Sequence, residues 1–214
     1  MKRYLALLLF IGCVGDQNEP QSAVVLFEKA QTVASKMKRG INIGNTLEPP
    51  EVGDWNNDFV SEYFFDDYLL AGFNTVRVPI RWDKHTLIDP PYTISGTWLD
   101  TVQQVVDWGL SKDLFIIINS HHDWWLVNNY DSTQARERFY AIWNQISKKF
   151  KNKSPKLLFE IINEPHGMTK ENVDELNVDI LQIIRRENPQ RIVIYGGHSW
   201  SNSDHLLQAE VLND

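Results

Sequence analysis

LFEIINEPHG, residues 158–167, is the segment of this sequence that decides its fold. Its first five residues are apolar except for Glu160, a pattern typical of a strand buried in a parallel sheet. Pro165 lacks an N–H group and therefore ends the ladder of the strand. The segment thus predicts a buried strand whose carboxyl end presents Asn163 and Glu164 at the rim of a sheet.

Strand-like apolar runs alternate with helical patterns along the rest of the chain. The strands centre on Ile41, Val76, Ile116, Leu158 and Ile192. Amphipathic helices are expected between them, at residues 59–71, 99–110, 133–150 and 173–186. Strict alternation predicts a parallel sheet with right-handed crossovers, either a doubly wound sheet or a (β/α)8 barrel.

Polar residues at the ends of these strands favour the barrel. In strand order they are Asn45 and Glu48, Arg77, His121 and His122, Asn163 and Glu164, and His198 and Trp200. A doubly wound sheet gathers its ligand groups at one switch point beside a glycine-rich phosphate turn, whereas a barrel draws them from many strand ends. Gly196-Gly197 is a weak candidate for such a turn, because no GxGxxG or GKS/T motif surrounds it. We therefore expect the first five βα units of an α/β (β/α)8 TIM barrel.

Glu164 and Asn163 indicate acid–base chemistry on a substrate with hydroxyl groups. A carboxylate held at the mouth of a low-dielectric barrel can give and take a proton near neutral pH. The amide beside it can hydrogen-bond a substrate hydroxyl. The alternative interpretation is a polar strand end followed by a proline turn.

Arg77 and two histidines offer further functional groups. An arginine fork can hold a carboxylate and keep it ionised, so Arg77 either positions a catalytic carboxylate or forms a structural ion pair with Glu160. Glu160 lies on the same side of its strand as Glu164 and is expected to be buried. His121 is expected to face the cleft and His122 to pack behind it. Since no third ligand stands at zinc-like spacing, neither a metal nor a cofactor is expected.

Four segments, taken together, resemble glycoside hydrolase family 5, the cellulase and endoglucanase group of clan A. They are residues 39–48, 72–82, 118–122 and 159–165, and the match runs from about residue 38 to residue 204. The resemblance implies retaining hydrolysis of β-1,4-linked glucans or related β-mannans. It also implies a glutamate acid/base after the fourth strand and a glutamate nucleophile after the seventh.

The resemblance also implies roles for single residues. Glu164 resembles the acid/base, Asn163 the amide that binds the sugar 2-hydroxyl, Arg77 the guanidinium that holds the nucleophile, and His121 the rim histidine. Asn45 and Glu48 match positions that contact sugars on the non-reducing side of the cut, with turn chemistry as the alternative. His122 and His198 are further candidates for substrate binding.

Aromatic residues near the strand-to-helix loops are candidates for stacking on a pyranose ring. They are Trp55, Trp82, Trp124, Trp125 and Trp200, with loop packing as the alternative for each. Trp200 is the best candidate for substrate binding, because it directly follows the fifth strand at the expected active rim.

The resemblance covers only the N-terminal part of the family's barrel, since it ends within the fifth βα unit. The nucleophile is therefore expected to be absent from this chain, although a retaining mechanism needs two carboxyl groups about 5 Å apart. The 214-residue chain is accordingly expected to be truncated and inactive alone. The alternatives are a non-catalytic carbohydrate-binding remnant, or an enzyme specific for β-mannan, xyloglucan or lichenan.

The first residues have the shape of a bacterial signal peptide. Lys2 and Arg3 precede an apolar run, residues 4–11, that is too short to span a bilayer. Cys13, the single cysteine, follows at a lipobox-like position, so residues 1–12 are expected to be a lipoprotein signal peptide with lipidation at Cys13. An ordinary secretory peptide is the alternative. Residues 13–22 form a polar tether, and residues 23–214 the partial catalytic domain.

Composition narrows the class of protein and its partners. The chain is 43% hydrophobic and carries a formal net charge of −7, without a basic cluster. It is therefore expected to be globular and not to bind nucleic acid. The expected partner is a β-glucan polysaccharide or oligosaccharide. The expected location is outside the cell or on its surface, for example as an outer-membrane lipoprotein, with membrane contact only through the lipid at Cys13.

Overall fold

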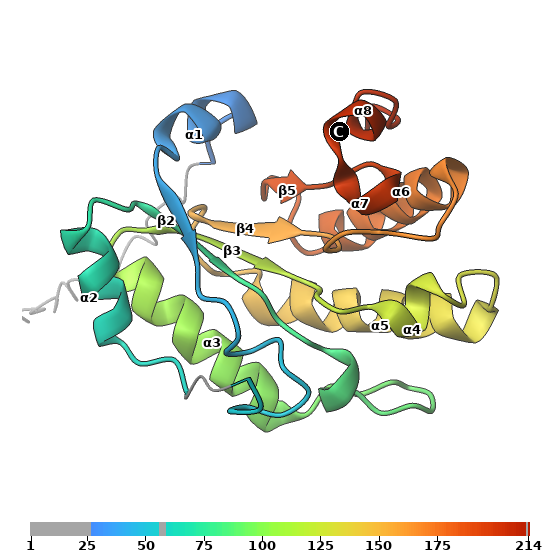
Figure 1. Ribbon diagram of the computed structural model, residues 1–214, viewed down its shortest axis with the longest axis horizontal. Helices are drawn as coiled ribbons and strands as arrows, with labels where there is room; N and C mark the ends of the chain where they lie inside the picture. Colours follow the sequence, from blue (N-terminus) through green and yellow to red (C-terminus); the bar gives the residue numbers. More distant parts are fainter. Residues whose placement is uncertain (1–26, 56–58, 213) are drawn as a thin grey trace, which may run out of the picture.

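The computed structural model describes residues 27–55, 59–212 and 214, and it has alternating strands and helices (Figure 1). The strands are β1 (Gly40–Asn42), β2 (Thr75–Val78), β3 (Phe115–Asn119), β4 (Leu157–Glu160) and β5 (Val193–Ile194). The helices are α1 (Ala30–Lys36), α2 (Tyr63–Leu70), the 3-10 turn η1 (Asp83–His85), α3 (Gly96–Ser111), α4 (Trp124–Val127), α5 (Thr133–Phe150), α6 (Lys170–Arg185), α7 (His198–Ser201) and α8 (Ser203–Leu206). The expected signal peptide, Cys13 and the tether lie outside the described residues.

The five strands form one sheet in the order β1-β2-β3-β4-β5, and every neighbouring pair is parallel. Each strand therefore lies beside the strand that follows it in the sequence. In a doubly wound sheet the strand order instead reverses at a switch point, so that later strands lie on both sides of the first. The observed order is that of a barrel wall, as predicted.

The sheet has one face against helices and one face that turns inward. Val76, Ile116 and Phe159 are fully buried and pack with residues of α3 and α5 in the main core. Phe115 and Leu158 point to the other face, where Val33 of α1 covers them. Figure 1 shows α3 and α5 on one side of the sheet and α1 on the other. Arg77 and Glu160 alternate with the outward residues and so lie on the inner face.

Local sequence signals explain where the long helices begin. The side chains of Ser95, Ser132 and Thr169 cap α3, α5 and α6 by accepting a hydrogen bond from a backbone N–H three residues later. The predicted range of α5 matches the observed one. The helix predicted from residue 59 begins only at Tyr63, because the preceding residues run irregularly with Val60 buried.

Arg191 joins three segments at the amino-terminal end of the sheet. It is fully buried, and its guanidinium donates to carbonyl oxygens of Phe150, Ser154 and Leu157 and to Oδ1 of Asn188. Burial lowers its pKa to about 10. The end of α5, the start of β4 and the turn before β5 are thus held to one side chain.

Among the described residues, no helix combines the length and the apolar composition of a membrane span.

Candidate active site

A pocket of about 320 Å³ opens at the carboxyl ends of the strands. Its lining residues are Asn42, Arg77, His121, His122, Asp123, Trp124, Val127, Asn163, Glu164 and His166. Six of the predicted candidates are therefore brought together: Arg77, His121, His122, Trp124, Asn163 and Glu164. Parallel strands place their carboxyl ends at one edge, which is why residues from β2, β3 and β4 meet there.

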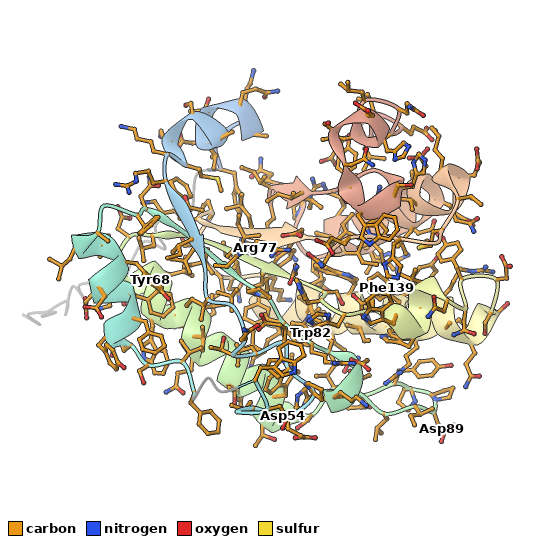
Figure 2. All side chains as sticks on the ribbon, viewed as in Figure 1. Asp54, Tyr68, Arg77, Trp82, Asp89 and Phe139 are labelled. Carbon is orange, nitrogen blue, oxygen red and sulfur yellow. The ribbon has the colours of Figure 1, made fainter. Side chains whose placement is uncertain are left out.

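Arg77 is held by an ion pair on the inner face of the sheet. Its Nε lies 2.6 Å from Oε2 of Glu160 and its Nη2 lies 2.7 Å from Oε1, a bidentate arrangement. Nη2 also donates to Oδ1 of Asn163 at 2.9 Å. Burial alone would lower the pKa of Arg77, but the hydrogen bond and charge of Glu160, with the charges of Glu164 and Glu48, raise it. Figure 2 shows Arg77 near the middle of the molecule.

Glu160 is therefore the partner of Arg77, as expected if Arg77 forms a structural ion pair. Glu160 is less buried than expected, since 15% of its side chain is exposed. Because both of its oxygens accept from the guanidinium, Glu160 is fixed in place. Arg77 in turn fixes Asn163, so the amide and the ion pair form one rigid unit below the pocket.

His121 is neutral and oriented by the strand that carries it. Asn119, the last residue of β3, donates from Nδ2 to Nδ1 of His121 at 3.1 Å, which leaves the ring proton on Nε2. Burial, followed by the neighbouring His122 and Arg77, lowers the pKa of His121 to about 3. His121 can therefore donate a hydrogen bond into the pocket without carrying charge.

His122 also borders the pocket instead of packing behind it. A positive φ of 60° turns the backbone at this residue, so the alternation expected of a strand no longer applies. Its ring stands edge-on to Trp55 at 5.3 Å and to His121 at 4.5 Å. Burial, then the charge of Arg81, lowers the pKa of His122.

Glu164 is exposed and stands on a fixed backbone. The N–H of the preceding Asn163 donates to the carbonyl oxygen of Ser120 at 2.8 Å, which continues the pairing between β3 and β4. The carbonyl oxygen of Pro165 accepts from the N–H of Trp200. The carboxylate is therefore presented at the rim from a segment that is tied on both sides.

The β1 loop places its two predicted residues differently. Asn45 is exposed, whereas Glu48 is 4% exposed and accepts from the N–H groups of Asn45 and Thr46. These hydrogen bonds stabilise the turn itself, which is the alternative role expected from the sequence for Asn45 and Glu48. Neither residue lines the pocket, although the charge of Glu48 acts on Arg77 and His122. Sugar contact by Asn45 and Glu48 stays a prediction.

The segment after β5 also lies outside the pocket itself. The ring of Trp200 is 59% exposed and stacks on His166 at 5.5 Å, and His166 does line the pocket. His198 instead stands against His205 at 4.0 Å. Substrate contact by either residue stays a prediction. Trp82 is fully buried, and its indole N–H donates to the carbonyl oxygen of Asn119. The prediction that Trp82 stacks on a sugar is therefore wrong.

Asp123 is a pocket residue that sequence reasoning missed. It is 5% exposed, and within the described part of the chain neither carboxylate oxygen has a hydrogen-bond partner. Burial raises its pKa to about 7, while the nearby side chains of Ser120 and Trp125 act in the opposite direction. Its position directly after the two histidines was the one available signal. His166 was missed too, although it follows Glu164 by two residues.

Comparison with known proteins identifies relatives of the chain. Residues 31–213 match the family described as Cellulase (glycosyl hydrolase family 5). Endoglucanase H of Acetivibrio thermocellus is 51% identical over 180 residues, which are 84% of this chain and 20% of that protein. Endoglucanase B of Ruminococcus albus is 33% identical over 214 residues, which are 90% of this chain and 51% of that protein.

Solved structures show the same architecture. Thermotoga maritima Cel5A in complex with mannotriose has a TM-score of 0.79 and 38% identity, over 83% of this chain and 57% of that one. A subfamily 4 endo-β-1,4-glucanase from Bacillus licheniformis, complexed with cellotetraose, has a TM-score of 0.81 and 42% identity, over 86% and 37% of the two chains. The predicted fold is confirmed, and the chain spans between 20% and 57% of the length of these four proteins.

Proposed function

The chain belongs to the cellulase family, glycosyl hydrolase family 5, and we propose that the protein hydrolyses internal β-1,4 linkages of glucans with retention of configuration. The observation that carries this proposal is the exposed Glu164 carboxylate beside a pocket of about 320 Å³. Asn163 lies next to it in a position fixed by Arg77 at 2.9 Å. A proton donor and a hydroxyl-binding amide on one fixed strand end suit the cleavage of a glycosidic bond.

Glu164 takes two roles in this proposal. It first gives its proton to the bridging oxygen while the bond from that oxygen to the sugar C1 breaks. It then accepts a proton from the water that releases the sugar from the enzyme. Asn163 donates from its amide nitrogen to the 2-hydroxyl, since its oxygen already accepts from Arg77. Neutral His121 adds an uncharged donor from Nε2.

The second carboxylate of a retaining mechanism needs a different source. Glu160 is bound at both oxygens by Arg77 and is therefore not free to attack C1. Asp123 is buried with a raised pKa. We therefore assign the nucleophile to a strand other than the five described, about 5 Å across the cleft from Glu164, as the family resemblance implies. Nη1 of Arg77 donates to Oδ1 of Asn42 at 3.5 Å, a long bond that leaves this nitrogen suited to contact with a second carboxylate.

Names of relatives guide the proposed substrate. Both curated relatives are called endoglucanases, and the Bacillus licheniformis enzyme was solved with cellotetraose. We propose β-1,4-glucan as the principal substrate on that basis. The mannotriose complex of Thermotoga maritima Cel5A favours β-mannan as a second candidate. A non-catalytic glucan-binding protein is the competing class.

Replacement of Glu164 by glutamine tests the proposal. In the intact protein, Glu164→Gln should abolish cleavage of natural β-glucan, which needs a proton on its leaving oxygen. An aryl β-cellobioside with an acidic phenol as leaving group should still form the glycosyl-enzyme, and a burst of phenol should precede slow turnover. Equal loss on both substrates would contradict the acid/base role. Absence of cleavage by the unaltered protein would support the binding class.

We also propose that the protein is secreted or held at the cell surface by a lipid on Cys13. The support is the order of basic residues, apolar run and cysteine at the start of the sequence. Surface location suits the proposed activity, because a polysaccharide is too large to enter a cell.

A further inference from the structure

His166 links the segment that carries Glu164 to the loops on either side of it. The centroid of its ring lies 3.9 Å from that of Trp124, on α4, and 5.5 Å from that of Trp200, on α7. The planes of His166 and Trp200 are 17° apart, so these two rings are stacked. Figure 1 shows the loop after β4 passing between α4 and α7. The imidazole therefore contacts two indoles, one from the loop after β3 and one from the loop after β5.

A hydrogen bond to the backbone orients the imidazole of His166. Its Nδ1 lies 3.1 Å from the carbonyl oxygen of Glu164. A carbonyl oxygen can only accept, so the bond needs a proton on Nδ1. The other ring nitrogen, Nε2, is buried and has no hydrogen-bond partner within the described part of the chain. The ring therefore directs its polar contact to the backbone of Glu164.

The position of the Glu164 carboxylate depends on this backbone. The side chain is exposed, and among the described residues it makes no hydrogen bond that would hold it. Pro165 restricts the backbone of the residue before it. The bond from His166 to the carbonyl oxygen fixes the plane of the peptide group between Glu164 and Pro165. The direction of the Glu164 side chain is thus set by the two residues that follow it.

The second indole is held in an uncommon backbone conformation. Ser199, Trp200 and Ser201 have φ values of 51°, 59° and 54°. Positive φ is uncommon for residues other than glycine, and it persists where the surrounding structure over-determines it. Trp200 has two contacts of this kind, because its N–H donates to the carbonyl oxygen of Pro165 at 3.4 Å and its ring stacks on His166. The strained turn therefore ends against the segment after β4.

We propose that His166 is a positioning residue for Glu164. Trp124 and Trp200 hold its imidazole in place for that role. The proposal rests on the proposed function, because it has a catalytic consequence only if Glu164 is the acid/base. A general acid must stay within hydrogen-bond reach of the leaving oxygen, and a misplacement of about 1 Å can cost about 100-fold in rate. His166 acts through Glu164 and takes no part in the proton transfer itself.

Two replacements separate the hydrogen bond from the ring. His166→Phe keeps an aromatic ring but removes the donor, whereas His166→Asn removes the ring but keeps an N–H donor near the place of Nδ1. In the intact protein, kcat/KM is measured for cellohexaose and for dinitrophenyl β-cellobioside, whose acidic phenol leaves without a proton. His166→Phe should lower kcat/KM for cellohexaose at least about tenfold and leave that for the cellobioside within about twofold. His166→Asn should retain more activity on cellohexaose than His166→Phe.

His85→Phe is the matched control. The ring of His85 also stacks on an indole, that of Trp98 at 3.6 Å, but it lies outside the pocket. This variant should change neither substrate. An equal loss on both substrates in His166→Phe would indicate a merely structural role and overturn the proposal. An unchanged value for cellohexaose, or a loss in His166→Asn as large as in His166→Phe, would overturn it too.

The tautomer of His166 gives a second test that does not depend on cleavage. Nuclear magnetic resonance of the intact protein with nitrogen-labelled histidine, assigned through the signals that His166→Phe removes, should show a proton on Nδ1 of this ring. A neutral ring with its proton on Nε2 could not donate to Glu164 and would overturn the proposal. If the unaltered protein cleaves neither substrate, the proposed function fails instead, and this measurement still decides whether the bond to Glu164 exists.

Discussion

Glu160→Gln is the substitution whose consequence follows most directly from the geometry. The change keeps the shape of the side chain but removes its negative charge. Arg77 then keeps its neutral contacts with Asn163, at 2.9 Å, and with Asn42, at 3.5 Å, while its two charged bonds at 2.6 and 2.7 Å are lost or weakened. The guanidinium on the inner face of the sheet loses its paired carboxylate, and the charges of Glu164 and Glu48 still act on it.

The expected cost follows from the burial of the pair. Removing one partner of a fully buried ion pair costs about 3–5 kcal/mol. Since 23% of the Arg77 side chain and 15% of the Glu160 side chain are exposed, some solvation remains. We therefore expect the free energy of unfolding to fall by about 2–4 kcal/mol. That is a large part of the stability of a typical domain.

Asp100→Asn provides a matched control on the surface. Asp100 pairs with Lys149 at 2.6 Å, but 73% of its side chain is exposed. Its loss should cost about 0–1 kcal/mol. Urea unfolding of the intact protein, followed by tryptophan fluorescence, measures both variants. A loss in Glu160→Gln no larger than that of the control would refute this account of Arg77.

A double variant separates an unpaired charge from lost packing. Arg77→Met/Glu160→Leu removes both charges, and its stability should recover toward that of the unaltered protein. Cleavage should nevertheless stay low, because Asn163 loses the contact that positions it. Stability as low as in Glu160→Gln alone would show that shape, and not charge, is what the pair supplies.

Two further outcomes are expected. The pKa of Asp123 is raised to about 7 in the fold, so between about pH 4 and pH 7 the unfolded chain loses this proton and the folded protein keeps it. Asp123 therefore lowers the stability of the fold as pH rises through that window. The stability gained by Asp123→Asn should grow up to about pH 7 and then level off. Parallel profiles of unfolding free energy against pH for the two proteins would contradict this. In a bacterium expressing the gene, labelled fatty acid should enter the protein and Cys13→Ser should prevent it, whereas equal labelling in both would exclude Cys13 as the attachment site.

The strand order and the shared rim could be predicted because they depend on patterns within the chain. Alternating apolar runs fix the strands, and parallel pairing brings the residues after successive strands to one edge. That is why the predicted site residues Arg77, His121 and Glu164 line one pocket. Ser132 caps α5, whose predicted start is the observed one, whereas the helix predicted from residue 173 already begins at Lys170, directly after its cap Thr169.

Features that depend on contacts between loops could not be predicted. Trp82 and Trp124 both follow strands, yet one is fully buried and the other half exposed. The difference arises from packing of distant segments, which periodicity does not record. His122 faces the pocket because its φ is positive, an irregularity in the backbone that no local motif announces. Asp123 follows from tertiary structure alone, because only the fold buries its carboxylate, which has no hydrogen-bond partner among the described residues.

Sequential strand order has a consequence for the way the protein is made. Each strand emerges from the ribosome with its neighbour already synthesised, so pairing can proceed from β1 onward. Arg77 is an exception, since its partner Glu160 comes 83 residues later. At a synthesis rate of about 5–20 residues per second, Glu160 is added roughly 4–17 seconds after Arg77. During that interval the guanidinium lacks the carboxylate that pairs with it in the fold, and the synthesis of β4 supplies that carboxylate.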